Sequence, residues 1–246
     1  MAQLISNERV DDIPLLLSQM RTLGLSELLD EHFAPHGNWK GLSLGNVVSG
    51  WLSYIISQGD HCLNQVEEWV EGLSICLKAC LSGSLRPLDF SDDRLATVLD
   101  ELSNDLAWER FEGALNSQTV RVYDLSVEIV RIDTTTASGH REPTTDGLFQ
   151  FGHSKDYRPD LPQVKIAQAA LDPLGMPVST SVVSGNRADD PLYIPEIKQV
   201  QMHLSKRGLL YVGDSKMSAI ETRGTWRRVR TTTSVHCLRC RCQRPT

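Results

Sequence analysis

Apolar residues recur at helical spacing through the first half of the chain, from about residue 12 to residue 117. The segments "IPLLLSQMRTLGLSELLDEHF", "LSLGNVVSGWLSYIIS" and "LNQVEEWVEGLSICLKACL" carry leucine, valine and isoleucine three and four positions apart. This pattern is typical of amphipathic helices. We therefore predict a helical N-terminal domain over residues 1–118.

The last segment of this half, "FSDDRLATVLDELSNDLAWERFEGAL", predicts one long helix. Ser91 is expected to be its N-cap, and the acids that follow suit the positive end of the helix dipole. Its stripe of Leu95, Leu99, Leu102 and Leu106 is expected to face a core.

Near Val122 the hydrophobic period shortens towards two and β-branched residues take over. The segments "VEIVRIDTTT", "VKIAQAALDPLGMPVSTSVVSGN" and "GLLYVGD" predict four strands, with "DPLG" as a turn between the second and third. Before the fourth strand, "DDPLYIPEIKQVQMHLSKRG" predicts a helix that Gly208 closes. The order strand, strand, strand, helix, strand favours an α/β layer architecture.

Composition places the chain among globular proteins. It has 246 residues, of which 40% are hydrophobic, so it can bury a core. It contains no run of about 18 apolar residues and no basic then apolar N-terminal region, so we expect no membrane partner and a cytoplasmic location. The six cysteines are expected to be reduced thiols. Cys62, Cys76 and Cys80 are interpreted as small buried residues.

The net charge of −6 is unevenly distributed. Residues 224–246 contain six arginines and no acid, so residues 1–223 carry −12 and the tail carries +6. Because nucleic-acid affinity comes largely from lysine and arginine at phosphates, any contact of the acidic body with DNA requires a local basic surface.

Two acids stand at the ends of predicted strands: Asp133 after "VEIVRI" and Asp214 after "GLLYVG". If the two strands are neighbours, both carboxylates lie at the same edge of the sheet, where α/β folds place their sites. Paired carboxylates suit Mg²⁺, which takes oxygen ligands and supports phosphodiester chemistry. The alternative is that each Asp is only the polar residue at which an ordinary strand ends.

Four segments in order resemble the catalytic core of bacterial insertion-sequence transposases of the DDE type: "IDTTTASG", "GHSKDYRPDLPQVKIA", "SVVSGNRADDP" and "YVGDSKMSA". The helical region also resembles the N-terminal domain of one group of those enzymes. The resemblance covers roughly residues 1–223. It implies an α+β or α/β fold in which the helical domain is followed by an incomplete ribonuclease-H-like domain over residues 119–223. The helical domain would bind DNA ends or form dimers.

The resemblance also implies an activity and its partners. The family uses three acids and two Mg²⁺ ions to cut and join DNA at element ends, and its first two acids fall on Asp133 and Asp214. The partners implied are element-end and target DNA, and another copy of the chain or a full-length transposase.

Two further segments have open interpretations. In "SKDYRPD", Lys155, Arg158 and Asp160 either lie near DNA or form a solvated loop with internal salt bridges. In "GNRADD", Asn186 and Asp189 either shape the edge of the site, or Asp189 or Asp190 caps the helix that follows.

Other kinds of site find no support in the sequence. His32, His36, His140 and His153 form no zinc spacing, and "HCLRCRC" lacks the second pair that a zinc ribbon requires. The chain contains no glycine-rich phosphate loop and no Gly-x-Ser-x-Gly motif.

The third acid of the family is a Glu on a helix well beyond the second Asp. Here the acid that follows Asp214 is Glu221, which is too close for that role, and apolar periodicity stops after Arg223.

A change of reading frame explains this stop. When "TWRRVRTTTSVHC" is back-translated with common codons and the frame is moved one nucleotide earlier, the new codons encode a peptide consistent with "LAxxADYYLCPL". This peptide resembles the family's sequence at this point. We therefore interpret residues 224–246 as an out-of-frame basic tail and expect a C-terminally truncated, inactive transposase, which does not bind the Mg²⁺ of the intact family productively. The alternatives are a DNA-binding or regulatory fragment, and a metal-dependent nuclease of this fold with a different third ligand.

We predict that the nucleotide sequence after codon 223 continues as an open frame when it is read one nucleotide earlier, and that this frame encodes a helical Glu. Sequencing the gene tests this, and a downstream region without such a frame contradicts it.

Overall fold

The computed structural model describes residues 7–35, 37–155 and 157–218. The chain divides into two compact units, Met1–Val122 and Tyr123–Thr246, called here the helical unit and the mixed unit. The basic tail and the change of frame expected after Arg223 lie outside the described residues. None of the described helices is both long and apolar enough to cross a membrane.

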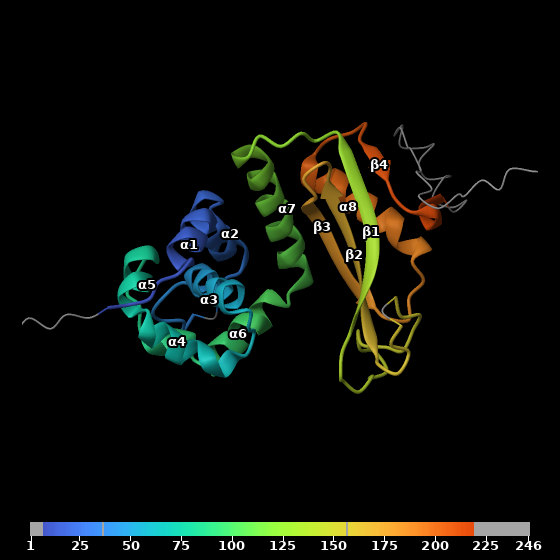
Figure 1. Ribbon diagram of the computed structural model, residues 1–246. Coiled ribbons are helices and arrows are strands. Elements are labelled where there is room, and N and C mark those ends of the chain that lie inside the picture. The colour runs from blue at the N-terminus through green and yellow to red at the C-terminus, as the bar shows by residue number, and fades with distance from the viewer. Residues whose placement is uncertain (1–6, 36, 156, 219–246) are drawn as a thin grey trace, which may run out of the picture. The chain divides into compact units, whose positions relative to one another are not determined.

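The helical unit confirms the helices expected from the 3.6-residue period (Figure 1). Its elements are α1 (Ile13–Thr22), α2 (Leu25–His32), α3 (Leu44–Gln58), η1 (Leu63–Gln65), α4 (Val66–Gly72), α5 (Ser74–Cys80), η2 (Pro87–Phe90), α6 (Asp92–Leu102) and α7 (Asp105–Val122).

Helix α3 lies at the centre of this unit. Leu44, Val47 and Trp51 of α3 are buried, and α1, α2, α4 and α6 all pack against it. A Cβ atom on Gly45 would lie 2.0 Å from the carbonyl oxygen of Ser26. Glycine therefore allows α2 to approach α3 more closely than any larger residue could.

The long helix expected over residues 90–115 is instead two helices. Ser91 caps α6 as expected, because its hydroxyl accepts a hydrogen bond from the Arg94 amide. The helix ends at Leu102, and the side chain of Asn104 accepts a hydrogen bond from the Ala107 amide as α7 begins.

This break also corrects the expected core stripe. Leu95 is buried and Leu102 is partly buried, but Leu99 is 46% exposed and Leu106 is 66% exposed. Leu95 shares its buried side of α6 with Val98, three positions on, rather than with Leu99. A new helix starts after Asn104, so the spacing of residues 95 to 106 does not describe one continuous face.

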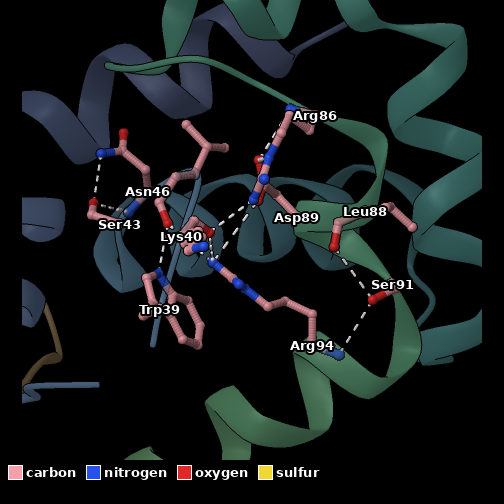
Figure 2. Close-up of polar contacts among 10 residues, drawn as sticks. Trp39, Lys40, Ser43, Asn46, Arg86, Leu88, Asp89, Ser91 and Arg94 are labelled. Atoms are coloured by element: carbon pink, nitrogen blue, oxygen red, sulfur yellow. Dashed lines mark hydrogen bonds and ion pairs between the residues drawn. The ribbon is translucent and has the colours of Figure 1, made fainter. Parts of the chain in front are cut away.

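A buried carboxylate joins η2 to the loop before α3 (Figure 2). Asp89 is fully buried, and its Oδ2 accepts a hydrogen bond from the Arg86 amide while its Oδ1 lies 2.7 Å from an Arg86 guanidinium nitrogen. Arg86 and Arg94 both donate to the Lys40 carbonyl oxygen, at 2.8 and 2.7 Å. The Arg94 guanidinium also stacks 3.4 Å from the centre of the Trp39 ring. Side chains from 86 to 94 thus fix a loop almost fifty residues earlier in the chain.

The mixed unit confirms the expected order of strands and helix (Figure 1). Its elements are β1 (Ile129–Ser138), β2 (Gln163–Leu171), β3 (Met176–Ser184), η3 (Asp190–Leu192), α8 (Tyr193–Leu204), β4 (Leu210–Val212) and η4 (Ser215–Ser218). The sheet order is β3-β2-β1-β4, with β1 to β3 antiparallel and β4 parallel to β1. The sheet is therefore mixed, which agrees with the α+β class expected from the sequence.

Helix α8 covers one face of the sheet and packs on β2 and β3 (Figure 1). Val130 and Ile132 of β1 are buried, whereas Arg131 and Asp133 are exposed, so β1 shows the alternation of a strand with one covered face. Gly208 does not close α8. The helix ends at Leu204, and Ser205 adopts the left-handed conformation that ends it.

A buried polar network joins α8 to β3. Glu196 is fully buried, and one of its carboxylate oxygens accepts a hydrogen bond of 2.8 Å from the Ser181 hydroxyl. Ser179 and Ser181 also both donate to Gln199, at 3.0 Å. Burial raises the pKa of Glu196, and the Ser179 and Ser181 hydroxyls and the charge of His203 only partly offset this.

We predict that Asp89→Asn destabilises the helical unit by about 2–4 kcal/mol, because it removes the buried charge that two arginines approach. Urea unfolding followed by tryptophan fluorescence reports on this unit, which holds Trp39, Trp51, Trp69 and Trp108. The control is Asp11→Asn, which breaks the exposed pair with Arg9 and should change stability by less than about 1 kcal/mol. Equal effects of the two substitutions would contradict the prediction.

We also predict that Glu196→Gln stabilises the mixed unit more at pH 8 than at pH 5. The folded pKa of Glu196 lies above its unfolded value, so the wild-type chain loses stability as pH rises through the folded pKa, and glutamine removes this loss. Amide hydrogen exchange of β2 and α8 measures the difference at both pH values. The exposed Glu142→Gln is the matched control and should show no such pH dependence.

Candidate metal centre

Asp133 is the fifth residue of β1 and lies on its exposed side, between the buried residues Ile132 and Thr134. The strand does not end at Asp133, as the sequence suggested, but continues to Ser138. Asp133 Oδ1 accepts a hydrogen bond of 2.7 Å from the Thr134 amide. The carboxylate therefore projects from the middle of a strand whose backbone is paired at this point with Gln168 of β2.

Asp214 follows β4, the parallel neighbour of β1. Arg131 pairs with Val212, so continuing this register by two residues brings Asp214 to the level of Asp133. Gly213 supports this register, because a Cβ atom placed on it would lie 3.3 Å from the carbonyl oxygen of Ile132. Adjacent strands are about 4.8 Å apart. Continued in this way, the register places the two acids, which the sequence predicted to share an edge of the sheet, at the same level of two adjacent strands.

The side chain of Asp214 is held by a tyrosine from α8. The Tyr193 hydroxyl donates to Asp214 Oδ1 at 2.6 Å, and the Lys216 amide donates to the same oxygen at 3.0 Å. Burial, the hydrogen bond to Asp214, and the charges of Asp214, Asp133 and Asp189 all raise the pKa of Tyr193. The hydroxyl therefore stays protonated and donates, and it lies within electrostatic reach of all three carboxylates.

Asp189 does not cap the helix as one interpretation of the sequence proposed. It makes no side-chain capping hydrogen bond. Instead its buried carboxylate forms ion pairs with Lys165 of β2, at 2.6 Å, and with Lys216. Burial alone would raise the pKa of Asp189, but the two lysines outweigh it and lower the pKa to about 2. The alternative interpretation, that Asp189 belongs to the edge of the site, agrees with its bond to Lys216.

Neighbouring Asn186 and Asp190 contribute less. The Ser184 hydroxyl donates to Asn186 Oδ1 at 2.9 Å, which is a local bond at the end of β3. Asp190 begins η3, and neither of these residues contacts Asp133 or Asp214 in the described part of the chain.

Within "SKDYRPD", the salt-bridge interpretation is correct for two residues. Arg158 and Asp160 form an exposed ion pair at 2.8 Å. Lys155 differs from them: its ammonium donates to the Thr134 hydroxyl at 2.8 Å and also to the Thr134 carbonyl oxygen. Its amide donates to the Thr136 hydroxyl at 3.2 Å. Two of the three threonines after Asp133 thus fix Lys155 against β1.

Tyr193, Lys165 and Lys216 were not predicted from the sequence as site residues. Tyr193 stands in a helical pattern, Lys165 in a strand pattern and Lys216 in a motif interpreted only for its Asp. Their place near the two acids depends on contacts between residues 21, 24 and 27 positions apart, which local periodicity does not predict.

The donor set of the two acids suits a hard cation. Asp133 Oδ2 and Asp214 Oδ2 accept no hydrogen bond from the described residues, so each carboxylate keeps one oxygen for a ligand. Mg²⁺ is commonly held by one or two carboxylates with waters or phosphate oxygens completing its shell. Residues Asp133 and Asp214 fit one such ion. Among residues 7–35, 37–155 and 157–218, no three His, Cys, Asp or Glu side chains gather at a metal-binding distance.

Cysteine does not enter the site. Cys76 and Cys80 are partly buried free thiols, but Cys62 is exposed, so the expectation that it is buried is wrong. Cys62 lies two residues after Asp60, and the Asp60 side chain accepts a hydrogen bond from the Cys62 amide in a local turn. The turn leaves the thiol on the surface.

No protein-family model matches the sequence, and no curated protein matches it. Solved structures similar to this chain include two Mos1 transposase complexes. The Mos1 transposase paired-end complex with left transposon end has a TM-score of 0.33 and 10% identity, over 94% of this chain and 79% of that chain. The Mos1 strand transfer complex has a TM-score of 0.32 and 10% identity, over 96% of this chain and 79% of that chain.

Proposed function

We propose that the mixed unit is part of the DNA-cutting and DNA-joining core of a DDE-type transposase. The observation that carries this proposal is the register of β1 and β4, which brings Asp133 and Asp214 to the same level of adjacent parallel strands. The sheet order and the four motifs described from the sequence support it.

In this proposal, Asp133 and Asp214 each give one carboxylate oxygen to Mg²⁺. The ion, when bound, supplies positive charge that activates an attacking water or hydroxyl and stabilises the leaving oxygen of a phosphodiester. The protein's own part is to hold the two carboxylates in place. Thr134 orients the first through its amide, and Tyr193 and the Lys216 amide orient the second.

The pair supplies two of the three acids of the family. The third is a Glu on a later helix, and Asp133 and Asp214 alone leave a pair of ions short of ligands. We therefore expect this chain by itself to be inactive in cleavage and strand transfer. Turnover of element-end DNA with Mg²⁺ by this chain would contradict that expectation. DNA binding without turnover is the outcome expected of both an inactive transposase and a regulatory fragment.

We predict that the full chain binds Mn²⁺, used as a probe for Mg²⁺, and that Asp133→Asn and Asp214→Asn each weaken binding by at least about tenfold. Each substitution removes one charged oxygen ligand. Electron paramagnetic resonance of free Mn²⁺ measures the affinity.

The matched control is Asp172→Asn. Asp172 belongs to the same unit and lies in the turn after β2, where its side chain forms an ion pair with Arg131 of β1. The Asp172→Asn substitution should therefore leave Mn²⁺ affinity within about twofold of wild type. Equal affinities for the wild-type chain, Asp133→Asn and Asp214→Asn would overturn the proposed site.

A further inference from the structure

Two side chains near the start of α8 contact the loop that carries Asp214. Neither of them is a metal ligand in the proposed site. Tyr193 is fully buried and Asp189 is 6% exposed. Each makes a polar contact with the segment after β4, Tyr193 with Asp214 and Asp189 with Lys216. These contacts join parts of the chain more than twenty residues apart.

The backbone alone does not hold Asp214. Strand β4 has three paired residues, and Asp214 lies two positions beyond the last of them. Among the described residues no ladder hydrogen bond fixes its backbone, whose carbonyl oxygen accepts one hydrogen bond, from the Met217 amide. The side chain in such a position can choose among rotamers. A carboxylate that is to bind a metal beside Asp133 needs its orientation from elsewhere.

A chain of charges supplies part of that orientation. Lys165 projects from β2 and is 5% exposed on its side chain, as is Asp189. Asp189 bonds Lys165 through one oxygen and Lys216 through the other. Lys216 in turn donates its amide to Asp214 Oδ1 at 3.0 Å. The loop after β4 is thereby tied to a strand on the far side of β1.

Stability alone is a weak reason for this arrangement. Burying an ion pair costs desolvation that its attraction often fails to exceed, and apolar side chains of similar size commonly pack as well or better. A buried tyrosine likewise needs a partner for its hydroxyl, yet this hydroxyl meets the carboxylate already proposed as a metal ligand. The Tyr193 hydroxyl and the Lys216 amide converge on one oxygen of Asp214, and the other oxygen accepts no hydrogen bond from the described residues.

We propose that Tyr193, Asp189 and Lys216 are positioning residues that orient the Asp214 carboxylate towards a metal ion shared with Asp133. This inference rests on the proposed function. Tyr193 acts on Asp214 Oδ1 directly. Asp189 acts through Lys216, whose ammonium it binds and whose amide reaches the same oxygen.

Two substitutions test this without exposing the buried Lys165–Asp189 pair. Tyr193→Phe removes the hydroxyl, and Lys216→Met removes an ammonium whose side chain is 43% exposed. In the full chain, each is expected to weaken Mn²⁺ binding 10–100-fold, the range typical of partners that orient metal ligands. Each should also speed hydrogen exchange of the backbone amide of residue 216 (Lys216, or the methionine that replaces it) at least about tenfold, while β2 amides stay within about twofold of wild type.

Matched controls separate positioning from the general effect of removing a buried hydroxyl or a surface charge. Tyr211→Phe removes the hydroxyl of another buried tyrosine, on β4 itself. Lys206→Met removes a lysine that donates to the Val127 carbonyl oxygen ahead of β1. Both should leave Mn²⁺ affinity and Lys216 exchange unchanged, and Lys216→Arg, which keeps the ion pair with Asp189, should restore most of the affinity lost in Lys216→Met.

The outcomes are distinct. Wild-type Lys216 exchange and Mn²⁺ affinity in Tyr193→Phe and Lys216→Met would overturn the inference, and so would faster exchange throughout β2, which indicates general loosening. A wild-type chain that binds no Mn²⁺ overturns the proposed function. The exchange rate of the Lys216 amide, which needs no metal, then decides by itself whether these residues position Asp214.

Discussion

The parallel pairing of β4 with β1 is the constraint on which the mixed unit depends. A parallel neighbour cannot follow a tight turn, so the chain must cross from one end of the sheet to the other, and α8 makes that crossing. The pairing sets the level of Asp214 against Asp133, and the crossing brings the start of α8 to the same edge. One register thus places both acids and the residues that surround them.

At the edge of the sheet that carries Asp133 and Asp214, most charged groups have an opposite charge or a hydrogen-bond donor as a partner. Asp189 is buried between Lys165 and Lys216, and the Tyr193 hydroxyl and the Lys216 amide share one oxygen of Asp214. Buried polar groups are stable only when they have partners, and here the partners come from β2, α8 and the loop after β4. In the described part of the chain, one oxygen of Asp133 and one of Asp214 accept no hydrogen bond, and these are the oxygens that a cation could use.

In the helical unit, local pattern predicts more than it does in the sheet. The 3.6-residue period and the Ser91 cap follow from side chains within a few positions of one another, and both are confirmed. The Leu99 and Leu106 positions were wrong because the helix breaks after Leu102 and the stripe loses its phase. Asp89 was not singled out at all, since its role depends on Lys40 and Arg94 arriving from different segments.

The sequence by itself determined which segments are helices and strands and marked Asp133 and Asp214 as acids next to apolar strands, because these features depend on neighbours close in the chain. Only the tertiary structure decided that β4 pairs with β1 in a register that aligns the two acids. It also decided that Tyr193 contacts Asp214 and that Asp189 pairs with Lys165 and Lys216 instead of capping a helix. Those outcomes depend on contacts between residues 20 to 80 positions apart, and no local period records them.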